Sequence, residues 1–170
     1  MIKKPFTTKE KLEEIAAKYP TPFHIYDEAG IRKNAEALKQ AFSWNKGFKE
    51  YFAVKATPNP FLIEILREYG CGCDCSSKTE LMLSKAIGAV GEDIMFSSND
   101  TPAEEFKYAA SLGATINLDD ITHIEVLEKT LGKLPKRLSC RYNPGGYFQI
   151  ANSIMDNPGD AKYGMTTEQL

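Results

Sequence analysis

An α/β fold built on a parallel sheet is predicted by this sequence, and a TIM-like (β/α)8 barrel is the favoured architecture. From residue 50 onward, five short strand-like runs alternate with four amphipathic helical patterns. Strict alternation with short connections places the strands parallel and covers the sheet with helices. An open doubly wound sheet is the competing architecture. No glycine-rich dinucleotide or phosphate motif follows the first strands, which favours the barrel.

The composition limits the classes of function. The 170 residues include 21 Lys and Arg against 23 Asp and Glu, a formal net charge of -2. This balance gives no electrostatic reason to expect nucleic acid or an anionic membrane as the main partner. No apolar run approaches the ~20 residues that cross a bilayer. Cys71, Cys73 and Cys75 make a poor disulfide framework, so we expect a cytoplasmic protein. Their spacing does not suit a metal site, and we expect small buried packing groups.

Residues 1–43 are predicted to lead into the barrel. Apolar residues at helical spacing indicate a helix on either side of a strand-like run, residues 22–27. The apolar stripes consist of Leu12, Ile15 and Ala16 in the first helix, and Ile31, Ala35, Leu38 and Phe42 in the second. Thr7 and Glu10 have the spacing of a capping box for the first helix.

Residues 44–170 are predicted to form the first part of the barrel. The predicted strands are residues 50–54, 71–75, 93–96, 114–118 and 137–142. The helix-start signals are Asn59 with Pro60, Ser77 with Glu80, Thr101 with Pro102 and Glu104, and Asp119 or Asp120. The apolar stripes of three of these helices are Leu62, Ile65, Leu66 and Tyr69; Leu83, Ala86, Ile87 and Val90; and Ile121, Ile124, Leu127 and Leu131. Residues 143–164 predict a long loop. The final TTEQL resembles the start of a helix, so we expect a truncated chain.

Lys55 is the first candidate for chemistry, because it ends the first barrel strand. Active sites of parallel α/β folds lie at that end of the strands. A lysine shielded there by the barrel wall would be held neutral and nucleophilic, as imine formation with an aldehyde cofactor requires. A snorkelling surface lysine is the alternative. If Lys55 faces the interior, alternation places Tyr51 and Ala53 there as well, and turns Phe52 and Val54 toward the helices.

Asp74 and Arg141 end two further predicted strands. One strand–helix–strand unit would bring Asp74 beside Lys55, where a carboxylate stabilises a lysine cation or a protonated imine. Alternatively, Asp74 caps the turn before Ser77. Arg141 could pair with a carboxylate or a phosphate, or form an ordinary salt bridge at the rim.

Several ordered motifs resemble those of the alanine-racemase-like, fold-type III pyridoxal-phosphate decarboxylases. The stretch YFAVKATPNP, residues 51–60, resembles the lysine-bearing signature, and CDCSSKTEL, residues 73–81, is similar to the second signature. Further similar stretches are TPFHIYD at 21–27, IMFSSNDTPAEE at 94–105, INLDDITHI at 116–124, RYNPG at 141–145 and AKYGM at 161–165. Among subfamilies, the chain is most similar to the one that converts meso-2,6-diaminopimelate to L-lysine.

The resemblance implies a homodimeric amino-acid decarboxylase, a lyase of lysine biosynthesis that uses pyridoxal 5'-phosphate. It implies a barrel of the alanine racemase type, here truncated to roughly its first five strands, and a C-terminal β domain that this chain lacks. Lys55 would be the catalytic residue that attaches the cofactor. Asp74, Ser77, Glu80 and Arg141 match positions near the cofactor. The partners implied are a small amino-acid substrate and a second subunit, with no metal, nucleic acid or membrane.

The chain departs from the family pattern in the loop after the fifth strand. The family often has a histidine there against the pyridoxal ring, whereas GGYFQIANSIMDNPGD has none, and Tyr147 or Phe148 could stack there instead. The family's phosphate loop, its acidic partner of the pyridine nitrogen and the groups lent by the second subunit come later than residue 170, so we expect this fragment alone to be inactive. The alternatives are a sibling decarboxylase of arginine, ornithine or carboxynorspermidine, and a non-catalytic pyridoxal-binding or interaction module.

Overall fold

A five-stranded parallel sheet organises the computed structural model, which describes residues 4–146 and 163–170. The strands are β1 (Tyr51–Ala53), β2 (Gly72–Cys75), β3 (Ile94–Phe96), β4 (Thr115–Leu118) and β5 (Leu138–Cys140). Each strand pairs in parallel with the next one along the chain, so the spatial order equals the sequence order. The predicted α/β class and the five predicted strands are confirmed.

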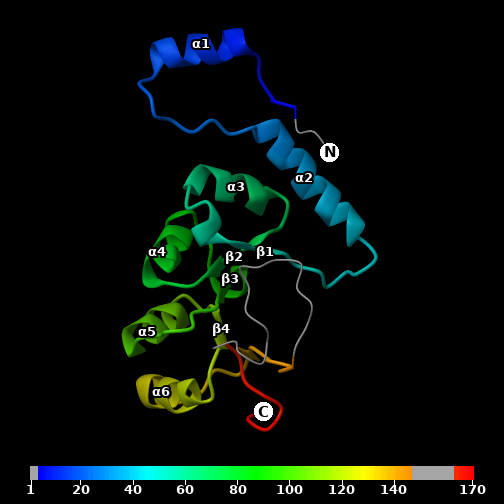
Figure 1. Cartoon of the computed structure of the whole chain (residues 1–170). Helices are drawn as coiled ribbons and strands as arrows, with labels where there is room; N and C mark the ends of the chain where they lie inside the picture. The colour runs from blue at the N-terminus through cyan, green and yellow to red at the C-terminus, as the bar shows by residue number, and fades with distance from the viewer. Residues whose placement is uncertain (1–3, 147–162) are drawn as a thin grey trace.

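Four helices connect the strands and cover one face of the sheet (Figure 1). They are α3 (Pro60–Glu68), α4 (Lys78–Ala86), α5 (Ala103–Ser111) and α6 (Thr122–Leu131). Two earlier helices, α1 (Lys9–Lys18) and α2 (Glu28–Ala41), precede the sheet, and single 3-10 turns are formed by η1 (Val54–Ala56) and η2 (Gly91–Asp93). Within the described ranges, no helix has the length and apolar character needed to span a membrane.

The hydrophobic core lies between the sheet and these helices. Alternation along the strands sends every second side chain into it. The fully buried strand residues are Cys73, Cys75, Ile94, Phe96, Ile116 and Leu118. Val54 of η1 is buried with them, and the helices contribute Ile63, Leu81, Phe106 and Leu127. Phe52 packs against the same core, so the predicted direction of Phe52 and Val54 is confirmed. Cys73 and Cys75 are the small buried packing groups that the sequence predicted.

The local helix signals after β1, β2 and β4 are satisfied as predicted. Asn59 Oδ1 accepts a hydrogen bond from the Phe61 N–H at 3.1 Å, with proline in the first turn of α3. Ser77 is the N-cap of α4, where its Oγ accepts the Glu80 N–H, and the Glu80 carboxylate reaches back to the N–H of Ser76, one residue before the cap. Of the two aspartates before α6, Asp120 makes the cap, because its Oδ1 accepts the Thr122 N–H at 2.8 Å. Asp119 is therefore free for another role.

The predicted strand at residues 22–27 is wrong. The segment is extended, and Phe23 and Ile25 are less exposed than His24 and Tyr26, as in a strand. No strand is assigned because none of the described strands lies alongside to supply the ladder hydrogen bonds.

Two helix starts also differ from the prediction. The α1 cap is Thr8 rather than Thr7, with the hydroxyl accepting the Lys11 N–H. The capping box at Thr101 is absent: α5 begins one residue later, after Pro102, and the buried Thr101 Oγ1 has no hydrogen-bond partner among the described residues.

The predicted apolar face of α4 is confirmed in part, because Leu83 and Ile87 pack against the core. Its buried residues are Leu81 and Ser84, whereas Ala86 and Val90 are exposed. The reason is that Ser84 packs inward against Cys75, with the two side-chain heteroatoms 3.2 Å apart.

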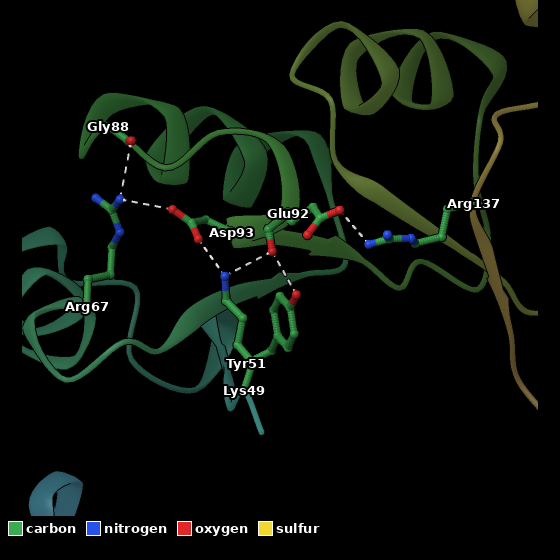
Figure 2. A network of polar contacts seen from close by, with 7 residues as sticks. All are labelled: Lys49, Tyr51, Arg67, Gly88, Glu92, Asp93 and Arg137. Atoms are coloured by element: carbon green, nitrogen blue, oxygen red, sulfur yellow. Dashed lines mark hydrogen bonds and ion pairs between the residues drawn. The ribbon is translucent and has the colours of Figure 1, made fainter. Parts of the chain in front are cut away.

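A polar network joins elements at the amino-terminal edge of the sheet (Figure 2). Lys49 Nζ lies 2.5 Å from Asp93 Oδ1 and donates to the Glu92 carbonyl at 3.1 Å, which also accepts the Tyr51 hydroxyl at 2.7 Å. Arg67 Nη2 lies 3.6 Å from Asp93 Oδ2. These bonds tie α3 and the start of β1 to η2, and the opposite edge of the sheet remains for chemistry. In barrels the amino-terminal face serves stability.

Candidate functional site

A polar hollow lies on the sheet face that the helices leave uncovered. It encloses about 340 Å³ and is lined by Tyr51, Asp74, Met95, Ser97, Asn117, Ser139 and Arg141. All five strands contribute, because alternation brings to this face the side chains that do not enter the core. Its carboxylate, amide, hydroxyls and guanidinium can therefore converge on one polar ligand.

Asp74 contributes the carboxylate of this surface. It lies in β2 opposite Ala53 of β1 and Met95 of β3. The Ser97 hydroxyl donates to Asp74 Oδ1 at 2.5 Å, and Ser97 is itself anchored because its N–H donates to the Cys75 carbonyl at 2.8 Å. The alternative in which Asp74 caps the following turn is wrong, since its carboxylate is engaged across the sheet.

Lys55 lies just beyond β1, within the 3-10 turn η1, rather than on the strand itself. Its side chain is exposed, so the predicted shielding by a barrel wall is wrong for the described residues. The physical reason is that five strands leave the uncovered face open, and nothing in the described ranges closes over Lys55. The sheet register nevertheless places Asp74 opposite Ala53, two residues before Lys55, at the same edge.

Ser77 and Glu80 are engaged at the start of α4. Glu80 Oε1 accepts the Ser76 and Ser77 hydroxyls at 3.0 and 2.9 Å, and Oε2 accepts the Ser76 N–H at 3.0 Å. Neither Ser77 nor Glu80 lines the hollow. They fix the turn that follows β2, at the same edge as Asp74.

Arg141 follows β5 and lines the hollow beside a buried carboxylate. Its Nη1 lies 2.7 Å from Asp119 Oδ1, and the Asp119 side chain is 3% exposed against 37% for Arg141. The contact is one of opposite charges, because no N–H of residues 4–146 or 163–170 points at Oδ1 with hydrogen-bond geometry. Arg141 thus forms an ion pair with a carboxylate and also lines the hollow with its side chain.

Four polar residues of this region fall outside the set predicted from the sequence: Ser97, Asn117, Asp119 and Ser139. The available signal was polar residues at alternate positions in otherwise apolar strands. Asn117, only 8% exposed, is the clearest case, since it lies between the buried Ile116 and Leu118. The predicted stacking residues Tyr147 and Phe148 lie outside the described residues.

Comparisons with known proteins show what the chain is similar to. The family model described as pyridoxal-dependent decarboxylase, pyridoxal binding domain, matches residues 28–170. The chain is 40% identical over 159 residues to Protein TabA of Pseudomonas amygdali pv. tabaci, covering 94% of this chain and 36% of that protein. It is 33% identical over 134 residues to a diaminopimelate decarboxylase of Thermoplasma acidophilum, covering 79% of this chain and 32% of the relative. The chain thus spans about a third of the length of these relatives.

Two solved structures are also similar. A diaminopimelate decarboxylase from Helicobacter pylori in complex with L-lysine superposes with a TM-score of 0.79 at 26% identity, over 93% of this chain and 40% of that one. An ornithine decarboxylase from Entamoeba histolytica superposes with a TM-score of 0.64 at 30% identity, over 74% of this chain and 38% of that one.

Proposed function

We propose, since this chain belongs to the family of pyridoxal-dependent decarboxylases, that the complete protein converts meso-2,6-diaminopimelate to L-lysine. The observation that carries the proposal is the family match over residues 28–170, which includes every strand of the sheet and Lys55. The choice of substrate is supported by the diaminopimelate decarboxylases of Thermoplasma acidophilum and Helicobacter pylori.

The residues of the hollow fit pyridoxal 5'-phosphate. An aldehyde cofactor needs a primary amine. Lys55 does not itself line the hollow, but it offers an exposed amine two residues after Ala53, which lies opposite Asp74. Asp74 supplies a fixed negative charge, Arg141 a positive one, and Ser97 and Asn117 neutral polar groups. The bound cofactor supplies a sink for the electron pair released when carbon dioxide leaves.

The protein's own contribution is to position the cofactor and to balance its charge. In the proposal, Lys55 attaches the cofactor, and Asp74, held by Ser97, balances the positive charge beside it. Ser77 and Glu80 act by holding the β2–α4 turn in place against the cofactor. The exposure of Lys55 implies that further parts of the complete protein exclude water, because a desolvated amine is the more reactive one.

The proposal also covers the domain organisation, the oligomeric state and the cellular location of the complete protein. Residues 1–43 would lead into the barrel, residues 44–170 would form its first part, and a C-terminal β domain would follow in the complete protein. The resemblance supports a homodimer. The four cysteines are free thiols, which suits a reducing cytoplasm.

Decarboxylation by the complete protein tests this proposal. The protein is loaded with pyridoxal 5'-phosphate, and carbon dioxide release is measured from diaminopimelate, lysine, arginine, ornithine and carboxynorspermidine. We expect kcat/KM to be at least tenfold higher for diaminopimelate, and Lys55→Ala to abolish release. The ornithine decarboxylase of Entamoeba histolytica makes ornithine the leading alternative. A higher kcat/KM for another amino acid of the panel would assign a sibling decarboxylase activity. Cofactor binding without carbon dioxide release from any of these amino acids would favour a non-catalytic module.

A further inference from the structure

Asp119 is a buried carboxylate that the helix caps do not explain. It follows β4, its side chain is 3% exposed, and the cap of α6 is made by Asp120 instead. A buried charge is costly unless it is paired. Among the described residues, the Arg141 guanidinium is the cation in contact with it, with Nη1 at 2.7 Å from Oδ1. Burial therefore makes Asp119 dependent on Arg141, and makes the position of Arg141 dependent on Asp119.

A returning segment of the chain closes around this pair. The Gly164 N–H donates to the Asp119 carbonyl at 3.1 Å, and the Met165 N–H donates to the Arg141 carbonyl at 2.7 Å. The Tyr163 ring centroid lies 5.8 Å from Arg141 Cζ, within the range of a cation–π contact. Met165 is 1% exposed, so this segment is anchored rather than loosely apposed.

Gly164 shows how close that approach is. Its φ of +86° lies in the left-handed region, where a side chain is disfavoured. A Cβ built on it would lie 3.1 Å from Arg141 Cγ and 3.2 Å from the Arg141 carbonyl oxygen. The segment thus holds both the backbone and the side-chain stem of Arg141.

We infer that Asp119 and Tyr163 are positioning residues that fix the Arg141 guanidinium in the hollow, where it meets an anionic oxygen of the bound cofactor. The inference rests on the proposed function, because the hollow must bind pyridoxal 5'-phosphate. A free arginine side chain loses rotamer entropy when it is ordered. The ion pair and the aromatic contact order it before the ligand arrives, so their loss lowers affinity without removing any group that touches the ligand.

The test measures the dissociation constant of pyridoxal 5'-phosphate for the complete apoprotein, by absorbance titration. Asp119→Asn keeps the shape and removes the charge, and Asp120→Asn is the matched control on the neighbouring half-buried cap. We expect Asp119→Asn to weaken binding at least tenfold and Asp120→Asn to change it less than twofold. In an Arg141→Met background, Asp119→Asn should change binding less than twofold, since it acts through Arg141.

A merely structural role would give a different pattern. Asp119→Asn would then weaken binding by the same factor with and without Arg141, and this result would overturn the inference. Wild-type affinity in a folded Asp119→Asn variant would overturn it too. If Asp119→Asn does not fold, Tyr163→Leu replaces it: we expect a loss of about two- to fivefold that vanishes in the Arg141→Met background. The inference is contradicted if Tyr163→Leu weakens cofactor binding equally in the Arg141→Met background, or if it weakens binding in neither background. If the wild-type protein does not bind pyridoxal 5'-phosphate, the proposed function is contradicted as well.

Discussion

Replacing Gly72 by alanine should destabilise the fold, because the uncovered face of the sheet has no room for a methyl group there. Gly72 lies in β2 directly opposite Tyr51 of β1. An added Cβ would lie 2.6 Å from Tyr51 Cδ1, 2.7 Å from Tyr51 Cε1 and 2.8 Å from the Asp93 carbonyl oxygen. The Tyr51 ring can move aside only if its hydroxyl leaves the Glu92 carbonyl, and the Asp93 oxygen belongs to the backbone.

The size of the effect follows from two opposing contributions. Overpacking at such a site costs about 1–3 kcal/mol. Alanine restricts the unfolded chain more than glycine does, which returns about 0.4–1 kcal/mol. We therefore expect Gly72→Ala to lower the free energy of unfolding by about 1.3 kcal/mol, the difference between the midpoints of these two ranges.

Urea unfolding of the complete apoprotein, followed by circular dichroism, measures this change. Gly47→Ala is the matched control, because Gly47 is exposed and an added Cβ would meet only Asn45 Oδ1, at 3.6 Å. The control should be neutral or slightly stabilising. A Gly72→Ala protein as stable as the wild type would refute the packing argument.

Three further predictions concern a charge, a cap and a thiol. The hydrogen bond from Lys49, and the nearby Arg67, lower the pKa of the Asp93 carboxyl. Its stabilisation is therefore complete above the ordinary value of about 3.9 and is lost as pH falls through the lower folded-state value, so wild type and Asp93→Asn should converge in urea stability on acidification. Asn59→Ala should destabilise the protein by about 1 kcal/mol in thermal unfolding, by removing the α3 cap. Burial raises the pKa of the Cys75 thiol to about 12, so iodoacetamide should label it only after unfolding, as read by mass spectrometry.

Each of these has a clear contrary result. A stability difference at Asp93 that widens as pH falls would mean that its carboxylate is not the stabilising form. An Asn59→Ala variant with unchanged melting would mean that another group caps α3. Rapid labelling of Cys75 in the folded protein would mean that its side of the sheet opens.

Local signals predicted the part of the fold that local interactions determine. Alternation and capping residues such as Asn59 and Ser77 placed the strands and most helix starts, because each acts within a few residues of chain. The run at residues 22–27 has the alternation of a strand, but strand formation needs a partner, which is a long-range property. The inward turn of Ser84 likewise depends on its contact with Cys75, across the helix–sheet interface.

The candidate site divides in the same way. Asp74 was predictable, since strand order and register follow from the α/β pattern. The exposure of Lys55 was not, because shielding depends on what covers the open face. The pairing of Asp119 with Arg141 depends on the return of residues 163–165, more than twenty positions after β5, and no spacing rule reports such a return.

Covalent mapping of the cofactor tests the central claim most directly. The complete protein is loaded with pyridoxal 5'-phosphate, reduced with borohydride, digested and examined by mass spectrometry. Attachment through the Lys55 amine predicts one stable adduct, on the peptide that contains Lys55, and its loss in Lys55→Ala. An adduct on another lysine, or none in a protein that retains the cofactor, would contradict the account.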